Sequence, residues 1–257
     1  MTTERIRLFG IEIDPLTREQ AVDRVYAWIE NPDGKCRFVV TPNVDHTVML
    51  QHHATFRKAY DDADLVLVDG MPVVLASRML KKPVPERVTG ADLTIDLLAA
   101  AARKERRLSV FFLGAADGVA NRAVNNVERT WPDVYAVGAY SPPIGFQNDE
   151  QENDRILAMI DSANPDILVV GLGAPKQELW VHAHQDRINA RVALCVGATI
   201  DFLAGEKSRA PLWMQNYGLE WCHRVMTEPK RLAARYAHDA WMFPKLVWCE
   251  WWYDTRA

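Results

Sequence analysis

The fold class follows from one stretch of the chain, Ile167-Leu168-Val169-Val170-Gly171-Leu172-Gly173-Ala174-Pro175-Lys176-Gln177-Glu178. Its first four residues are apolar and mostly β-branched, which is typical of a short strand buried on both faces of a parallel sheet. Two glycines then give a tight turn, and Pro175 suits the first turn of a helix. The stretch therefore predicts a strand that passes directly into a helix.

The same alternation runs along most of the chain. Further short apolar runs lie at 38–40, 65–68, 110–113 and 192–196, and amphipathic stretches lie at 17–29, 92–103, 118–130 and 150–163. This order predicts an α/β, Rossmann-like, mostly parallel sheet with helices on both faces. Six of the nine tryptophans fall after residue 206. We therefore expect a catalytic core over residues 1–205 and a separate helical appendage, rich in Trp and Arg, over residues 206–257.

Composition excludes several classes of protein. The chain has 257 residues, 49% of them hydrophobic, and a formal net charge of -4, which argues against a nucleic-acid partner. Its four cysteines are far apart and form no C-x-x-C pair, so the sequence predicts neither a zinc site nor a disulfide framework, and a reducing cytoplasm fits best. We find no secretory signal pattern at the N-terminus and no run of about 18 apolar residues, so we expect neither secretion by that route nor a membrane span.

Glycines and polar residues follow the predicted strands. In open α/β sheets, ligands bind beyond the carboxyl ends of the strands, so these segments are expected to meet at one ligand-binding edge. They supply most of the candidate site residues: Thr41, Asn43, Asp69, Gly114, Gly171, Gly173, Lys176, Gln177, Glu178 and Asp201.

The turn at Gly171-Leu172-Gly173 is a candidate phosphate site, because backbone N–H groups at the start of a helix attract anions. The dinucleotide fingerprint G-x-G-x-x-G is not met, since Lys176 stands at its sixth position. A tight connection between strand and helix uses glycine without any ligand as well, and these two interpretations are evenly matched. Glu178 has a similar alternative, since an acid in the first turn favours the helix dipole.

Asp69 stands at the end of an apolar run and precedes Gly70. This places a carboxylate at the expected ligand edge, where a general base is needed. Asp-Gly is also a common turn between elements, and the residues alone favour that interpretation.

The sequence predicts no metal site. Asp62-Ala63-Asp64 resembles the D-x-D motif of nucleotide-sugar enzymes, but it precedes its strand and so falls at the opposite edge of the sheet. His52 and His53, like His182 and His184, are too close in sequence to share a helix face.

Two basic segments are candidates for binding phosphate groups. The proline-broken loop 81–90 carries Arg87, whose planar guanidinium suits a diphosphate, and precedes a helix that Asp92 is expected to cap. A solvated connection is the alternative. Residues 224–245 have five Lys or Arg against two acids and are followed by Val247-Trp248-Cys249-Glu250-Trp251-Trp252. Basic residues beside tryptophans favour a membrane surface, whereas a cap docked on the core or on another subunit is the alternative.

Together these stretches resemble the WecG/TagA/CpsF glycosyltransferase family over about residues 38–236. The resemblance rests on blocks that occur in the family's order: Thr41-Pro42-Asn43, Asp69-Gly70-Met71-Pro72, Arg87-Val88-Thr89-Gly90-Ala91-Asp92-Leu93, residues 171–178, and a long run from Val196-Gly197 through Arg209-Ala210-Pro211 and Gly218-Leu219-Glu220-Trp221 to Glu228-Pro229-Lys230-Arg231.

The resemblance implies an inverting transferase that needs no metal or other cofactor. Such an enzyme uses a UDP-sugar and extends an undecaprenyl-diphosphate-linked saccharide, as a peripheral protein on the inner face of the bacterial plasma membrane. The same resemblance implies that the C-terminal appendage closes over the site at the membrane. A homo-oligomer that hides the appendage's apolar surface is a further hypothesis.

The resemblance also implies roles for individual residues. Asp69 is the expected base for the acceptor hydroxyl, aided by Thr41, Asn43 and Arg87. The donor is expected to meet Gly114, Gly171, Gly173, Lys176, Gln177, Glu178 and Asp201. The acceptor diphosphate is expected to meet Arg224, Arg231 and Arg235.

Departures from the family's pattern leave the donor sugar open. Met71-Pro72 and Ala198-Thr199 differ from the usual residues, and family members use N-acetylmannosamine, its uronic acid, glucose or other hexoses. The alternative functions are another Rossmann-type nucleotide-dependent enzyme and a non-catalytic, nucleotide-binding membrane scaffold.

Overall fold

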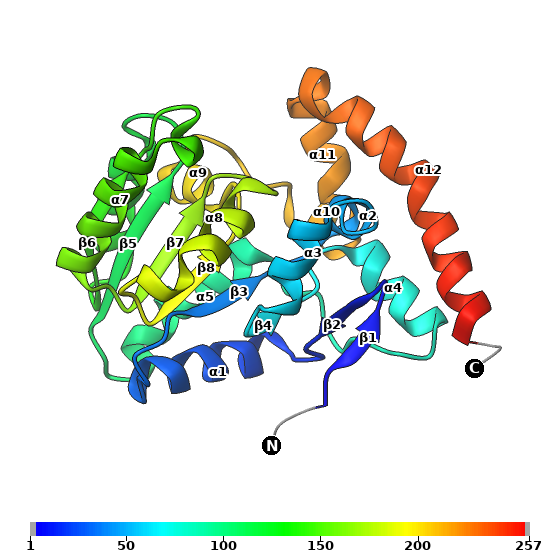
Figure 1. Cartoon of the computed structure of the whole chain (residues 1–257), viewed down its shortest axis with the longest axis horizontal. Coiled ribbons are helices and arrows are strands. Elements are labelled where there is room, and N and C mark those ends of the chain that lie inside the picture. Colours follow the sequence, from blue (N-terminus) through cyan, green and yellow to red (C-terminus); the bar gives the residue numbers. More distant parts are fainter. Residues whose placement is uncertain (1–3, 255–257) are drawn as a thin grey trace.

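A six-stranded parallel sheet forms the centre of the molecule (Figure 1). In this computed structural model residues 4–254 are described, with all side chains except those of Asn216, Arg231 and Asp254. The strands lie in the order β4-β3-β8-β7-β5-β6, which confirms the Rossmann-like α/β fold. Their bounds are β3 (Arg37–Val40), β4 (Leu65–Val66), β5 (Leu108–Gly114), β6 (Val134–Tyr140), β7 (Ile167–Gly171) and β8 (Val192–Cys195).

Helices cover both faces of this sheet. Neighbouring residues of a strand point to opposite faces, so Val169 packs with one core and Val170 with the other. One face is covered by α1 (Arg18–Glu30), α5 (Gly90–Arg103), α6 (Val119–Thr130) and α9 (Thr199–Ala204). The other is covered by α3 (Ala54–Asp61), α4 (Met71–Met79), α7 (Glu150–Ala163) and α8 (Lys176–His184), with short 3-10 turns η1 (Phe146–Asn148) and η2 (Gln185–Arg187) beside them.

Three strands were not predicted from the sequence. Strand β6 is at the edge of the sheet and mostly half-exposed, so it lacks the continuous apolar run that marks the inner strands. At the N-terminus, β1 (Ile6–Leu8) and β2 (Ile11–Ile13) form an antiparallel hairpin. Its turn is Phe9-Gly10, and both residues have positive φ, as a two-residue hairpin turn of this kind requires.

The predicted cap of α5 was wrong. The helix begins at Gly90, and the Thr89 hydroxyl accepts a hydrogen bond from the Asp92 backbone N–H at 2.9 Å. Thr89 is therefore the capping residue. Asp92 is left in the first turn, where its carboxylate pairs with Arg18 and Arg209.

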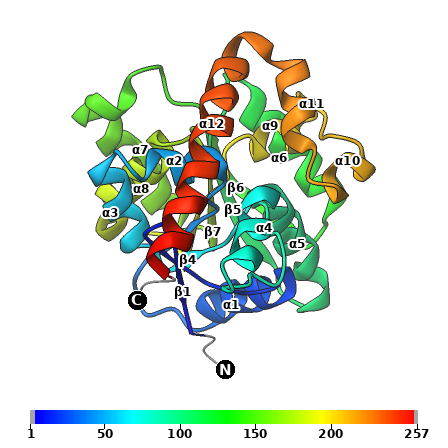
Figure 2. The ribbon, with the colours of Figure 1, turned by 90° about the vertical axis from the view of Figure 1, so that its right-hand side faces the viewer.

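The described C-terminal residues form three helices, α10 (Leu212–Asn216), α11 (Glu220–Thr227) and α12 (Pro229–Asp254). Near the start of the chain, the short helix α2 (Val44–Met49) follows β3. Helix α12 lies alongside α2 (Figures 1 and 2), where Arg235 pairs with Asp45 at 3.1 Å. Further along α12, the ring of Phe243 packs on that of Phe9 with centroids 5.4 Å apart. The helical character of this segment agrees with the sequence, whereas its standing as a separate domain from residue 206 stays a prediction. Within residues 4–254, none of the helices combines the length and the hydrophobicity that a membrane span requires.

Candidate active site

A pocket of about 310 Å³ lies between the carboxyl ends of β3, β4 and β8 and the C-terminal helices. Its core-side wall comes from the segments that follow these strands and from the loop before α5. Its other wall comes from α11 and α12. The charged residues that line it are Asp45, Asp69, Arg87, Glu220, Arg224 and Asp239.

Asp69 is held at this pocket by its backbone. Its N–H donates to the carbonyl of Pro42 at 2.9 Å, which joins it to the segment after β3. Gly70 then begins the turn into α4, and a Cβ at Gly70 would lie 3.3 Å from the Asn43 Cα. The two predicted segments Thr41-Pro42-Asn43 and Asp69-Gly70 are therefore packed side by side.

The environment of Asp69 changes its acidity. The pKa of Asp69 is raised to about 6, mainly by burial and also by the nearby Glu220 carboxylate, while Arg224 and Arg87 oppose the rise. The side chain is half-buried and faces the pocket. At neutral pH it is mostly ionised yet a stronger base than an ordinary aspartate, which is what general-base catalysis needs.

Asn43 and Thr41 have different placements. The Asn43 Oδ1 accepts a hydrogen bond from the His46 N–H at 3.1 Å and caps α2, while the residue also lines the pocket. Thr41 is buried and does not line the pocket.

Some of the arginines predicted to bind phosphate line this pocket or lie next to it. Arg87 and Arg224 line it, with the Arg87 Nη1 3.4 Å from the Glu220 Oε2 and the Arg224 guanidinium 5.7 Å from the centre of the Phe202 ring. Arg235 lies next to the pocket, paired with the lining residue Asp45. The side chain of Arg231 lies outside the described residues.

The glycines that end β5 and β7, and the glycine that follows β8, pack backbone against backbone. A Cβ on Gly114 would lie 2.5 Å from the Gly171 carbonyl oxygen, and one on Gly171 would lie 2.8 Å from the Gly197 oxygen. Both contacts are too short for any other residue, so packing alone requires these two glycines. This edge adjoins the pocket, because Val196 and Thr199, on either side of Gly197, line it.

Gln177 joins two of these turns. Its Oε1 accepts hydrogen bonds from the N–H groups of Gly173, at 3.2 Å, and Gly197, at 3.1 Å. Its Nε2 donates to the Glu178 Oε1 at 2.9 Å. In this conformation Gln177 is buried and occupies the N–H of Gly173, which belongs to the turn expected to face a phosphate, as well as that of Gly197.

Glu178 has no exposed surface at all. Burial raises the pKa of Glu178 to about 7, and its Oε2 has no hydrogen-bond partner among the described residues. The carboxyl group is therefore part of the interior beside Gln177, and its predicted contact with a donor remains untested.

Residues 6–257 match the family described as "Glycosyl transferase WecG/TagA/CpsF family". The chain belongs to this family. It is similar to two proteins of Staphylococcus aureus, from strains MRSA252 and NCTC 8325 / PS 47, each named N-acetylglucosaminyldiphosphoundecaprenol N-acetyl-beta-D-mannosaminyltransferase. Each is 28% identical over 230 residues, which cover 90% of this chain and 87% of the relative. The protein is a glycosyltransferase.

Two other predicted donor residues of this glycosyltransferase lie outside the pocket. Asp201, on α9, is paired with Lys207 at 3.7 Å. Lys176 begins α8 and is partly exposed. Their contact with a donor stays a prediction.

The acids of the D-x-D motif are far from the pocket, as predicted. Asp62 accepts a hydrogen bond from the His182 ring at 2.8 Å, and Asp64 pairs with Arg37 at the amino end of β3 at 2.9 Å. Among residues 4–254, we find no group of three or more His, Cys, Asp or Glu arranged to hold a metal ion.

Several pocket residues of the transferase were not singled out from the sequence. The pocket lining also includes Asp45 on α2, Glu220 on α11, Tyr236 and Asp239 on α12, and Thr89 just before α5. Glu220 belongs to the block Gly218-Leu219-Glu220-Trp221, and Asp45 follows Asn43 by two residues. Only the docking of α11 and α12 brings Glu220 and Asp239 to the pocket.

Proposed function

We propose that this glycosyltransferase moves a sugar, with inversion, from a UDP-sugar to a saccharide linked to undecaprenyl diphosphate. The observation that carries the proposal is the half-buried Asp69, with its pKa raised to about 6, in one pocket with Arg87 and Arg224. A base beside two guanidinium groups fits a reaction that removes a hydroxyl proton and releases a nucleoside diphosphate.

In the proposed reaction, the Asp69 carboxylate takes the proton of the acceptor hydroxyl. The acceptor oxygen forms a bond to the anomeric carbon of the donor from the face opposite the diphosphate. The bond from that carbon to the phosphate oxygen breaks, and UDP leaves with the electron pair. Arg87 and Arg224 stabilise the charge that develops on the leaving diphosphate. No metal or other cofactor takes part in this proposal.

The donor and acceptor are proposed from the relatives' names. Those proteins act on N-acetylglucosaminyldiphosphoundecaprenol and transfer N-acetyl-beta-D-mannosamine. An N-acetylmannosamine-type sugar is therefore the first donor to test, with other hexoses as alternatives. The glycine edge formed by Gly114, Gly171 and Gly173 adjoins the pocket and is the proposed place for the donor nucleotide.

The experiment measures UDP release from a panel of UDP-sugars, with and without a short-chain lipid-diphosphate acceptor. Acceptor-stimulated release that is lost in Asp69→Asn and unaffected by a chelator supports the proposal. The matched control is Asp62→Asn, at the other edge of the sheet, which should keep full activity. No release from any UDP-sugar would reject the UDP-sugar transferase and favour the scaffold.

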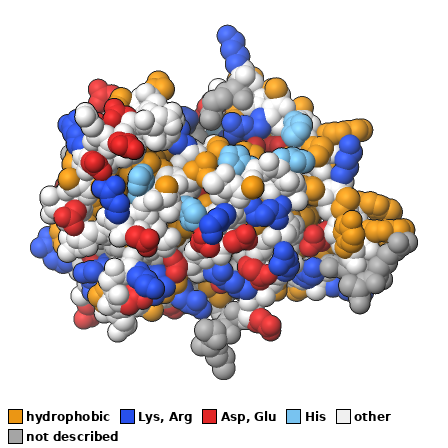
Figure 3. Space-filling view, in the orientation of Figure 1, with side chains coloured by type: hydrophobic (Ala, Val, Ile, Leu, Met, Phe, Trp, Pro, Cys, Tyr) orange, Lys and Arg blue, Asp and Glu red, His pale blue; other side chains and the backbone are white. Residues whose placement is uncertain are grey.

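We also propose that the enzyme works as a peripheral protein at the inner face of the plasma membrane. Hydrophobic side chains gather along α12 at the right-hand edge of Figure 3. Trp241 and Trp248 lie one heptad apart on this helix, 68% and 62% exposed, with the Lys245 ammonium 4.2 Å from the centre of the Trp241 ring. Aromatic rings beside a cation suit an anionic lipid surface.

Sedimentation with vesicles of anionic phospholipid tests this membrane contact. Full-length protein should bind, and the double variant Trp241→Gln, Trp248→Gln should bind at least about tenfold more weakly, because two interfacial rings are lost. Trp28, which lies in α1 and packs against the core, provides the control variant Trp28→Phe. Light scattering tests the alternative that this face is covered by a second copy of the chain. In that case the particle formed by the double variant would have a lower molar mass than that of the natural chain.

A further inference from the structure

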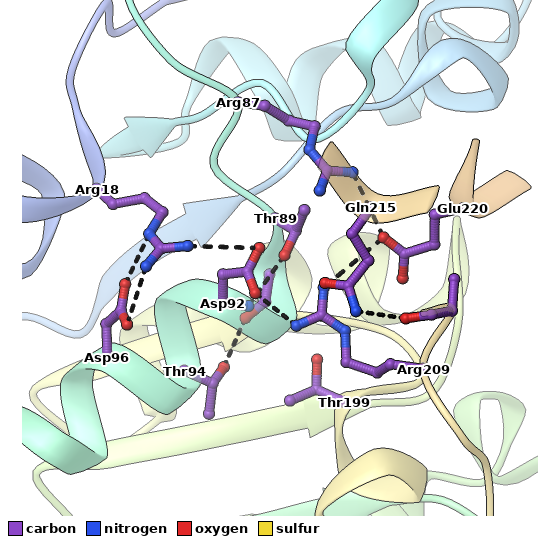
Figure 4. Close-up of polar contacts among 12 residues, drawn as sticks. Arg18, Arg87, Thr89, Asp92, Thr94, Asp96, Thr199, Arg209, Gln215 and Glu220 are labelled. Atoms are coloured by element: carbon purple, nitrogen blue, oxygen red, sulfur yellow. Dashed lines mark hydrogen bonds and ion pairs between the residues drawn. The ribbon is translucent and has the colours of Figure 1, made fainter. Parts of the chain in front are cut away.

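Two guanidinium groups approach a single carboxylate oxygen at the pocket wall. The Glu220 Oε2 lies 3.4 Å from the Arg87 Nη1 and 3.7 Å from the Arg209 Nη2 (Figure 4). Arg87 comes from the core loop before α5, Arg209 from the connection between α9 and α10, and Glu220 from the start of α11. The three side chains are 14–17% exposed, so these charges are shielded from bulk water.

Arg209 has donors to spare. Its Nη1 is paired with Asp92, which fixes the guanidinium against the first turn of α5. Its Nε and Nη2 are buried, and neither has a hydrogen-bond partner among the described residues. Buried donors without partners are costly, so a group that satisfies them binds with a corresponding gain.

The contacts with Glu220 are loose for charged partners. Hydrogen bonds between a guanidinium and an anion are normally about 2.7–2.9 Å long. Both distances to the Glu220 oxygen are longer, so this carboxylate accepts one long hydrogen bond from Arg87 and leaves the Arg209 Nη2 without a partner among the described residues. A phosphate group has more acceptor oxygens and more negative charge, and it can approach both arginines at once.

We propose that Arg87 and Arg209 together form the diphosphate-binding site of the substrate, and that Glu220 occupies this site until the diphosphate displaces it. The proposal rests on the proposed function for the nature of the substrate. It adds Arg209 to the arginines of the site and gives Glu220 the role of an internal competitor.

The exchange also affects the rest of the pocket. Glu220 and Arg224 lie one turn apart on α11, so the same helix presents a negative and a positive charge to the pocket. When the diphosphate takes Arg87 and Arg209, α11 loses its ionic contact with both. The helix is then free to adjust, with Arg224 able to follow the bound phosphates.

A structural role and a competing role for Glu220 predict opposite effects of its mutation on the binding of anions. If Glu220 only fastens α11 to the core, Glu220→Gln loosens the pocket and weakens the binding of anions. If Glu220 competes with the substrate, Glu220→Gln removes the competitor and strengthens binding. The sign of the change therefore separates the two roles.

Isothermal titration of the full-length chain with inorganic pyrophosphate provides the test. We expect Glu220→Gln to bind pyrophosphate about fivefold to tenfold more tightly than the natural chain, as for a coupling of ordinary size between two sites. We expect Arg209→Met, made in the Glu220→Gln background, to bind at least about tenfold more weakly than Glu220→Gln alone, because a charge-assisted contact is lost. Glu206→Gln is the matched control, since Glu206 is exposed and pairs with Arg122 outside the pocket.

Unchanged or weaker binding by Glu220→Gln would overturn the competitor role. Unchanged binding after loss of Arg209 would overturn its place in the site. Arg209→Lys serves if Arg209→Met fails to fold, which thermal unfolding of each variant detects. The titration needs neither sugar nor acceptor, so its outcome is independent of whether the chain transfers a sugar from any UDP-sugar.

Discussion

Replacing Asp69 by asparagine is expected to lower activity strongly and, at neutral pH, to stabilise the protein. The pKa of Asp69 is raised from 3.8 to about 6, chiefly by burial. An acid whose pKa is raised on folding is protonated more readily in the folded chain than in the unfolded chain. Its contribution to stability is therefore present at low pH and is lost as the pH rises from about 4 to about 6. Asparagine does not ionise, so the variant escapes this loss.

The magnitude follows from the size of the shift. A change of about two pKa units corresponds to about 3 kcal/mol, at 1.36 kcal/mol for each unit. Asp69 faces the pocket, where water screens its charge, so we expect about 1–2 kcal/mol of this to appear. Urea unfolding at about pH 7.5 should show Asp69→Asn to be more stable than the natural chain by that amount, and the difference should vanish near pH 4. In the same variant, kcat/KM should fall by about 100-fold to 10,000-fold, as for loss of a general base.

The control variant Asp62→Asn is expected to change stability in the opposite direction. Asp62 carries a pKa that its hydrogen bonds with His182 and Lys58 hold below the ordinary value, so Asp62→Asn should slightly destabilise the protein at neutral pH. The reasoning about Asp69 is refuted if Asp69→Asn is no more stable than the natural chain at about pH 7.5, or if a stability difference persists unchanged near pH 4.

Three further predictions concern the groups around Asp69 and the glycine edge. Arg224→Met should raise the pKa of Asp69 and Glu220→Gln should lower it, because Arg224 opposes and Glu220 supports the rise in the natural chain. The acid limb of the plot of kcat/KM against pH should therefore move to higher pH in Arg224→Met and to lower pH in Glu220→Gln. Gln177→Leu should destabilise the protein by about 2 kcal/mol in urea unfolding, since the N–H groups of Gly173 and Gly197 lose their acceptor and the Glu178 Oε1 loses its donor. Gly171→Ala should lower the thermal midpoint strongly, because its Cβ would lie 2.8 Å from the Gly197 oxygen, whereas Gly34→Ala, with open space around the added Cβ, should cost only the strain of its positive φ.

The inner strands were predictable because their environment is uniform. Strands β3, β5, β7 and β8 are covered by helices on both faces, so each appears in the sequence as an unbroken apolar run. Strand β6 has only one neighbour and a mostly half-exposed surface, and the hairpin strands β1 and β2 have three residues each. Such short or half-exposed strands depend on contacts with distant residues, which local pattern does not report.

The site was predictable where it depends on strand ends. Asp69 and Asn43 are brought together because parallel strands end at one edge, which follows from the fold class. Gln177 and Glu178 belong to the same edge, yet their side chains turn inward to the backbone of neighbouring turns and to the interior. The direction of a side chain in the first turn of a helix depends on the packing around it, and the sequence does not determine that direction.

The C-terminal helices contribute to the chemistry of Asp69 as well as to the walls of the pocket. Burial is the largest cause of its raised pKa, and α11 and α12 form the side of the pocket that faces it. The next two influences, Glu220 and Arg224, both lie on α11. Movement of these helices away from the core would admit water to Asp69 and remove both charges, and its pKa would fall toward the value of an ordinary aspartate. The base is therefore strongest when the helices are docked, so the helices that bear the exposed tryptophans also control the acidity of the group proposed to start the reaction.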